Sequence, residues 1–318
     1  MSRLNYEKKD LGPSFAIAVA TLVFSSLILI LIFGNDATGW KFWLMQALFT
    51  LFIGGSAFLY AGVTKTNVFT ATKLNVKPRY THVLWGALAV IFLIACMTPI
   101  NNALLDGIEY LGLKRPSVEL ENNLAGLLVV ACLLPAICEE LVFRGTVAQS
   151  IAEVNKLAAL AINGALFALF HANPAQTIHQ FLLGAFLALL VYRSGSLWTG
   201  VIVHLFNNVL VVVLSYTPIG ADEFWSFSTN TGVVVACSCV GVIGFTLSIF
   251  GYVKTTQSAW HRSCDVHDES STNVSNNDEN STPIPSKSSL KTNPASVIML
   301  VGAVVICAAL WITNLLAI

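Results

Sequence analysis

Two carboxylates and one guanidinium stand in the most apolar part of the chain. In "AICEELVFRG", Glu139, Glu140 and Arg144 follow a run from Ala125 to Ile137 that holds nothing charged. An ionised side chain near the centre of a bilayer costs about 2.5–3.5 kcal/mol. Three such groups within one short stretch therefore need partners or a chemical role.

Spacing separates the two carboxylates. Glu140 lies four residues before Arg144, the favourable order for a helical ion pair, so we predict that this pair is structural. Glu139 points about 100° away on a helix and has only Pro135 and Phe143 four residues to either side. A carboxylate without a local counter-ion is a candidate general base, although such groups also mark ion pathways.

Two histidines in other apolar segments fit beside Glu139. His171 ends "FALFH", with Phe167 four residues before it, and His204 lies in "HLFNN", with Asn208 four residues after it. Residues four apart share one helix face. Counting 1.5 Å per residue from the expected turns places Glu139 and His171 at similar depth and His204 shallower. We predict a buried pocket lined by Glu139, His171, His204 and Asn208.

The remaining histidines carry no predicted chemistry. His82, His261 and His267 lie in loops or at span ends and are expected to contact solvent, and His179 stands near the start of a span.

The elements that hold these residues must be membrane helices. Of 318 residues, 55% are hydrophobic and 11% are charged, whereas soluble domains carry about 25% charged residues. Basic and acidic residues balance at 17 each, so no nucleic-acid partner is expected. Apolar runs long enough to span a bilayer occur at 14–34, 42–63, 82–105, 123–148, 156–172, 176–193, 197–216, 232–253 and 296–317. We predict an all-α polytopic membrane protein with eight or nine transmembrane helices and an intramembrane active site.

Loop charges predict the orientation. Basic residues at the N-terminus and between the second and third spans indicate a cytoplasmic N-terminus; they are Arg3, Lys8, Lys9, Lys65, Lys73, Lys77 and Arg79. The segment 254–295 is rich in Ser, Asn and Thr and is expected to be a disordered linker. We expect an integral protein of a bacterial plasma membrane, with a final span that catalysis does not require.

Three motifs together resemble a known family. "EELVFR", "FALFH" and "HLFNN" match EExxxR, FxxxH and HxxxN, in this order and on separate membrane helices. In this they resemble the CPBP family, which includes the CAAX prenyl endopeptidases and bacterial relatives linked to bacteriocin processing or self-immunity. The resemblance covers roughly residues 120–215.

The resemblance implies an intramembrane endopeptidase acting on a membrane-associated protein or peptide. It implies that Glu139 activates water, that His171 is the second catalytic residue, and that His204 with Asn208 binds the oxyanion or positions the water. The supporting residues of the first two motifs would be Glu140, Arg144 and Phe167. The chain then divides into N-terminal helices (1–120), a catalytic core (121–216), an additional helix (217–253), the linker (254–295) and a C-terminal helix (296–318).

A metal and the activity itself are left open by the residues. Two histidines and a carboxylate form a legitimate zinc set, so Glu139, His171 and His204 could hold zinc, but the same residues could run a metal-free, glutamate-based reaction. A proton-coupled transporter and a non-catalytic immunity or scaffold protein are the alternatives. No inverted repeat supports the transporter, and the four site positions keep chemically competent side chains.

Overall fold

A computed structural model describes residues 5–35, 37–113, 123–152, 155–217, 227–265 and 293–317. These residues form helices and turns, with no strand among them. Eight helical segments within them are long and apolar enough to cross a membrane. The remaining predicted span, 156–172, corresponds to a shorter apolar helix, α8 (Lys156–Phe170). The predicted all-α polytopic fold is confirmed.

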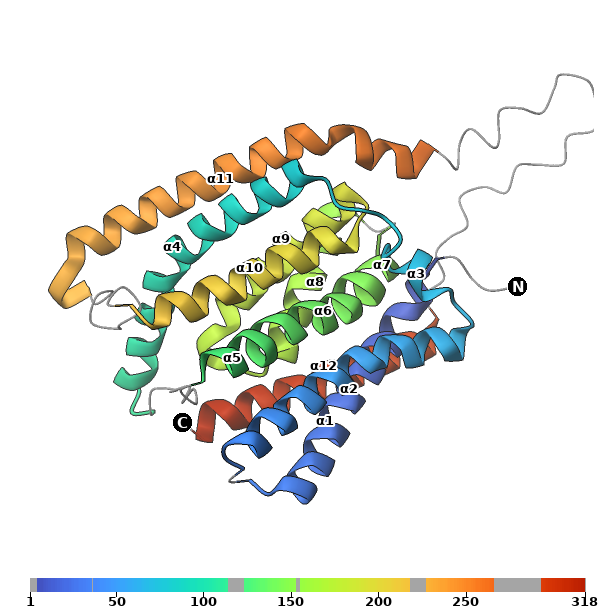
Figure 1. Cartoon of the computed structure of the whole chain (residues 1–318), viewed down its shortest axis with the longest axis horizontal. Coiled ribbons are helices and arrows are strands. Elements are labelled where there is room, and N and C mark those ends of the chain that lie inside the picture. Colours follow the sequence, from blue (N-terminus) through green and yellow to red (C-terminus); the bar gives the residue numbers. More distant parts are fainter. Residues whose placement is uncertain are drawn as a thin grey trace, which may run out of the picture.

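The helices form a central group between two outer groups (Figure 1). One outer group pairs α4 (Tyr80–Tyr110) with α11 (Phe227–Asp265). The other packs α1 (Leu11–Phe33) against α2 (Trp40–Thr64) and α12 (Pro294–Ala317). The central group holds α8, α9 (Thr177–Ser194), α10 (Leu197–Ser215) and the helix that carries the Glu-Glu pair.

The helix with the two carboxylates contains two π-helical segments along its length. It runs through α5 (Leu124–Gly126), η2 (Leu127–Leu133), α6 (Leu134–Glu140), η3 (Leu141–Val147) and α7 (Ala148–Ser150). Both η2 and η3 are π-helical: Leu134 N–H donates to Val129 O, and Ala148 N–H donates to Phe143 O, five residues back in each case. Pro135 has no N–H to continue an α-helical ladder, which favours a wider turn before it. Two π segments thus flank α6, and such segments are frequent at functional sites.

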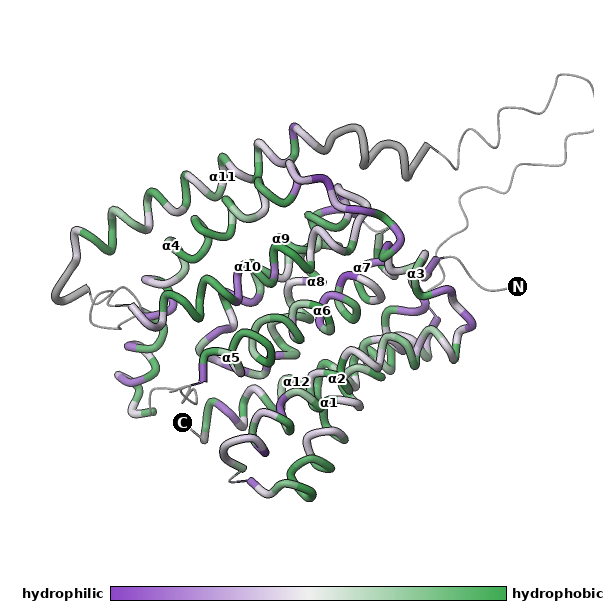
Figure 2. The backbone as a smooth tube through the Cα atoms, in the orientation of Figure 1, coloured by the Kyte–Doolittle hydropathy of each residue, from purple (hydrophilic) through white to green (hydrophobic). Residues whose placement is uncertain are grey.

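Apolar side chains cover the outside of the bundle. Figure 2 shows apolar residues along the length of the helices and polar residues gathered towards their ends. Leu31 is 85% exposed and Leu157 77%, as expected for side chains that face lipid rather than water.

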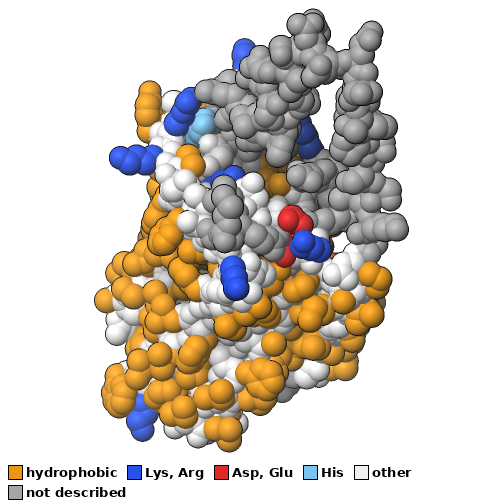
Figure 3. Space-filling model, turned by 90° about the vertical axis from the view of Figure 1, so that its right-hand side faces the viewer, with side chains coloured by type: hydrophobic (Ala, Val, Ile, Leu, Met, Phe, Trp, Pro, Cys, Tyr) orange, Lys and Arg blue, Asp and Glu red, His pale blue; other side chains and the backbone are white. Residues whose placement is uncertain are grey.

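Basic residues gather at one end of the molecule. Figure 3 shows Lys and Arg side chains on the end where α3 (Val68–Ala71) lies, above a body covered by apolar side chains. The loop after α3 bonds to the turn between α9 and α10: Leu197 N–H donates to Lys73 O (3.2 Å), and Trp198 Nε1 donates to Leu74 O (2.9 Å). The basic loop and this turn are therefore on the same side, as the predicted topology requires.

Some predictions of the sequence are changed or fall outside the described residues. Helix α11 continues to Asp265, so the first part of the predicted linker, from 254 on, is helical. The rest of the linker, 266–292, lies outside the described residues, and so does His267. Arg3 and the side chains of Lys8 and His261 also lie outside them. The expectation that His82 contacts solvent is wrong. It is 3% exposed, and its ring packs edge-on against Tyr252 at 5.6 Å.

Candidate active site

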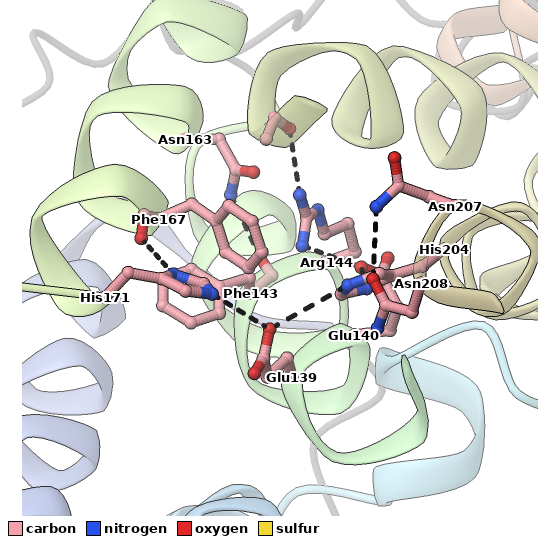
Figure 4. Close-up of polar contacts among 11 residues, drawn as sticks. Glu139, Glu140, Phe143, Arg144, Asn163, Phe167, His171, His204, Asn207 and Asn208 are labelled. Carbon is pink, nitrogen blue, oxygen red and sulfur yellow. Dashed lines mark hydrogen bonds and ion pairs between the residues drawn. The ribbon is translucent and has the colours of Figure 1, made fainter. Parts of the chain in front are cut away.

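Three separate helical segments bring a carboxylate and two imidazoles together (Figure 4). Glu139 Oε2, at the end of α6, lies 3.6 Å from His171 Nε2 and 4.0 Å from His204 Nε2. Within the part of the chain that the structure describes, this oxygen is buried and has no hydrogen-bond partner. The structure therefore brings Glu139, His171 and His204 close together, as the sequence predicts.

His171 is oriented by its own helix. It follows the last residue of α8, and its Nδ1 lies 2.9 Å from Phe167 O. A carbonyl oxygen only accepts, so Nδ1 carries the proton and the lone pair of the neutral ring is on Nε2. That lone pair faces Glu139 Oε2 at a distance of 3.6 Å. Both atoms are acceptors, so each needs a donor such as a water molecule.

Glu140 and Arg144 form the ion pair that their spacing predicts. Both side chains are fully buried, and Arg144 Nη1 donates to Glu140 Oε1 at 2.7 Å. Arg144 Nη2 also donates to Gly184 O on α9 at 3.1 Å, and its guanidinium lies 4.3 Å from the centre of the Phe167 ring. The pair therefore joins the Glu-Glu helix to α8 and α9.

Glu140 has a second role that the sequence alone did not reveal. His204 Nδ1 lies 3.0 Å from Glu140 Oε1, the same oxygen that Arg144 contacts. The carboxylate accepts, so it keeps a proton on Nδ1 and turns Nε2 towards Glu139. The two adjacent carboxylates thus contact opposite nitrogens of one imidazole.

Close packing of α10 against α6 makes this contact possible. A Cβ atom on Gly200 would lie 2.5 Å from Glu140 Oε2 and 2.9 Å from Val191 Cγ2. Only glycine fits here without moving the buried carboxylate. Gly200 stands one helical turn before His204, so the same approach brings the imidazole to Glu140.

Asn208 lies beside His204 and is held by its neighbour (Figure 4). Asn207 Nδ2 donates to Asn208 Oδ1 at 3.1 Å. With its oxygen engaged, Asn208 presents its own NH₂ group as a donor. Asn207 is buried, and its side chain lies near His179 on α9. Sequence reasoning passed over Asn207 and His179; the doubled Asn in "HLFNN" was the available signal for the first.

Another residue that the sequence analysis missed fixes the helices relative to each other. The buried Asn163 of α8 donates through Nδ2 to Phe143 O in η3 at 3.1 Å. Phe143 also packs edge-on against Phe167, with ring centres 4.9 Å apart. These contacts tie the helix of His171 to that of Glu139. An amide in the otherwise apolar "KLAALAINGALFALF" was the signal for this residue.

The donor types suit zinc better than their spacing does. Among the described residues, no group of three or more His, Cys, Asp or Glu side chains is arranged to hold a metal ion. His204 Nε2 stands 4.0 Å from the carboxylate oxygen of Glu139, whereas bonds of about 2.0–2.2 Å place the donors of a tetrahedral zinc site about 3.4 Å apart. The site as it stands does not close around zinc, so we derive no step through a metal.

Comparison with known families bears on the same residues. Residues 121–210 match the family model described as type II CAAX prenyl endopeptidase Rce1-like. Residues 121–210 therefore form a domain of the CPBP (CAAX protease) family. The matched segment, here called the CPBP domain, contains Glu139, His171, His204 and Asn208. Comparison with curated proteins and with solved structures gave no match. The predicted family is confirmed, and the chain is an integral membrane protein with a domain of a protease family.

Proposed function

We propose that the protein is an intramembrane endopeptidase that hydrolyses a peptide bond of a membrane-associated protein or peptide. The observation that supports this most directly is the buried Oε2 of Glu139, which has no hydrogen-bond partner in the described residues and faces two imidazole nitrogens at 3.6 and 4.0 Å. A structural carboxylate at this depth would be paired, as Glu140 is.

The first step is the attack of a water molecule that is held by Glu139 and His171. A water molecule between Glu139 and His171 donates one hydrogen to the carboxylate and one to Nε2. As the water oxygen attacks the scissile carbonyl carbon, Glu139 takes one proton as general base. The Phe167 carbonyl keeps His171 in the tautomer that accepts from this water.

The charge that forms on the carbonyl oxygen needs donors already in place. Asn208 offers its NH₂ group because Asn207 occupies its oxygen. His204 donates through Nε2 when its ring carries both protons, and the Glu140 carboxylate on Nδ1 offsets the added charge, as a buried carboxylate does beside a catalytic histidine.

Collapse of the tetrahedral intermediate completes the reaction. The proton held by Glu139 passes to the leaving nitrogen, the C–N bond breaks, and the products are a carboxylic acid and an amine. Glu139 returns to its carboxylate form, so the catalyst is regenerated. A cytoplasmic N-terminus and a bacterial plasma membrane complete this proposal on the basis of the loop charges and composition.

The test is cleavage of a reporter whose scissile segment is tethered to the membrane. Purified wild type in proteoliposomes should release the reporter fragment, and Glu139→Gln should release none while remaining folded. Leu31→Ala, on an exposed outer face, is the matched control and should cleave like wild type. Wild type and Glu139→Gln behaving identically, with no fragment from either, would contradict the protease and favour a transporter or a scaffold.

A further inference from the structure

The loop that follows His171 is held by the last helix of the chain. Asn314 Nδ2 on α12 donates to Ala172 O at 2.7 Å, and Trp311 Nε1 donates to Thr177 Oγ1 at 2.8 Å. Leu315 packs in an apolar cluster that includes Ala175. These three α12 residues are spaced i, i+3 and i+4, so they share one helix face. We call them, with their loop partners, the α12 latch.

The latch acts on a strained part of the backbone. Ala172 has a φ of +47°, a left-handed conformation that L-residues other than glycine and asparagine rarely adopt. Its carbonyl is the atom that Asn314 contacts. The chain reverses at this residue directly after His171, so the Asn314 bond holds the backbone next to the end of α8 on which His171 stands.

Hydrogen bonds within the loop connect Thr177 to the residues that follow Ala172. Thr177 Oγ1 donates to Asn173 O at 2.9 Å, and Asn173 Oδ1 accepts from Ala175 N–H at 3.0 Å. Trp311 therefore bonds to Thr177, whose hydroxyl group also holds the loop together through its bond to Asn173. The other end of α12 is fixed as well, since Gly12 N–H of α1 donates to Ser296 Oγ at 3.2 Å.

We propose that Trp311 and Asn314 are positioning residues for His171, so that α12 is part of the catalytic apparatus although it lies outside the CPBP domain. The predicted effect on kcat rests on the proposed function. The predicted effect on the position of His171 does not. It replaces the expectation that the final span is unnecessary for catalysis. A 1 Å displacement of a catalytic group can cost about 100-fold in rate, so loosening one loop bond should have a measurable effect.

Two variants test the latch in the full-length protein. Asn314→Leu removes the bond to Ala172, and Trp311→Phe removes the indole N–H that bonds to Thr177 and leaves a smaller aromatic ring. Each should lower kcat about tenfold with KM unchanged. Thr313→Val is the matched control, because Thr313 Oγ1 bonds within its own helix, to Ala309 O, and it should behave like wild type.

A readout independent of cleavage keeps this proposal separate from the protease assignment. Carbethoxylation of His171 by diethyl pyrocarbonate, followed by mass spectrometry, should become about threefold faster in Asn314→Leu because local opening exposes the ring. Modification of His204 in the same sample should stay at the wild-type rate. If wild type cleaves nothing, the proposed function fails while this measurement still decides the latch.

A second substitution distinguishes positioning from general damage. Glycine adopts a positive φ without strain, so Ala172→Gly in the Asn314→Leu background should restore most of the lost kcat and slow His171 modification again. A role limited to docking α12 would not be rescued at position 172. Wild-type kcat and wild-type His171 reactivity in the Asn314→Leu, Trp311→Phe double variant would overturn the proposal.

Discussion

Glu140 Oε1 lies 2.7 Å from Arg144 Nη1 and 3.0 Å from His204 Nδ1, so one buried oxygen serves both an ion pair and an imidazole. Adjacent Glu139 faces the other nitrogen of that imidazole at 4.0 Å. The two adjacent carboxylates therefore face opposite nitrogens of the His204 ring. Glu140 holds the ring, and in the proposed mechanism Glu139 remains available as the general base.

Glu139→Gln should abolish cleavage without destabilising the protein. The amide cannot take a proton from water, and loss of a general base costs about 10²–10⁴-fold in rate. No hydrogen bond of Glu139 Oε2 is broken in the described structure. The check is kcat beside thermal unfolding in detergent; a folded variant that keeps wild-type kcat would contradict the assignment.

Glu140→Gln should lower both stability and activity. It leaves Arg144 buried without its counter-ion, and breaking a buried pair costs about 3–5 kcal/mol. It also loosens His204, so the fraction that remains folded should have reduced kcat. Unfolding midpoints and kcat per folded molecule separate the two effects. A normal kcat in the folded fraction would limit Glu140 to a structural role.

Gly200→Ala should resemble Glu140→Gln in its effect. The added methyl group would lie 2.5 Å from Glu140 Oε2, and overpacking of this kind costs about 1–3 kcal/mol. Displacement of the carboxylate should carry His204 with it and reduce kcat. Gly302→Ala on α12 is the matched control because nothing lies within 4 Å of its added Cβ; equal losses in the two variants would count against the contact.

Asn208→Ala should lower kcat by about 10²–10³-fold with little change in KM, the loss typical of one oxyanion donor. Asn208→Asp should be at least as damaging, since it replaces the donor by an anion. Asn207→Ala should have a smaller effect, because it frees the Asn208 amide without removing it. Steady-state kinetics of the three variants check this order, and an Asn208→Asp enzyme as active as wild type would refute the donor role.

Metal removal should leave the activity intact. The spacing of Glu139, His171 and His204 does not close around zinc, and each proposed step uses side chains alone. Protein treated with a chelator and verified metal-free by elemental analysis should cleave the reporter at the wild-type rate. Loss of cleavage on metal removal, with recovery on adding zinc, would replace the glutamate mechanism by a metal-dependent one.

The sequence was most informative where a residue type conflicts with its surroundings. Glu139, Arg144 and His204 are costly in apolar helices, so their positions alone pointed to a pairing and a site. The latch was not foreseeable, because Trp311 and Asn314 contact a loop more than a hundred residues earlier in the chain and follow no local spacing rule. The second role of Glu140 was hidden for the same reason.

The π segment η3 accounts for part of a difference between the sequence estimate and the structure. Counting 1.5 Å per residue put His204 shallower than Glu139, yet the two side chains meet. A π turn holds more residues than an α turn, and η3 lies between Glu139 and the basic end of its helix. The number of residues therefore does not give the distance along the axis of this helix accurately. A height assigned to Glu139 by counting residues alone therefore places its carboxylate too far from the basic end of the helix.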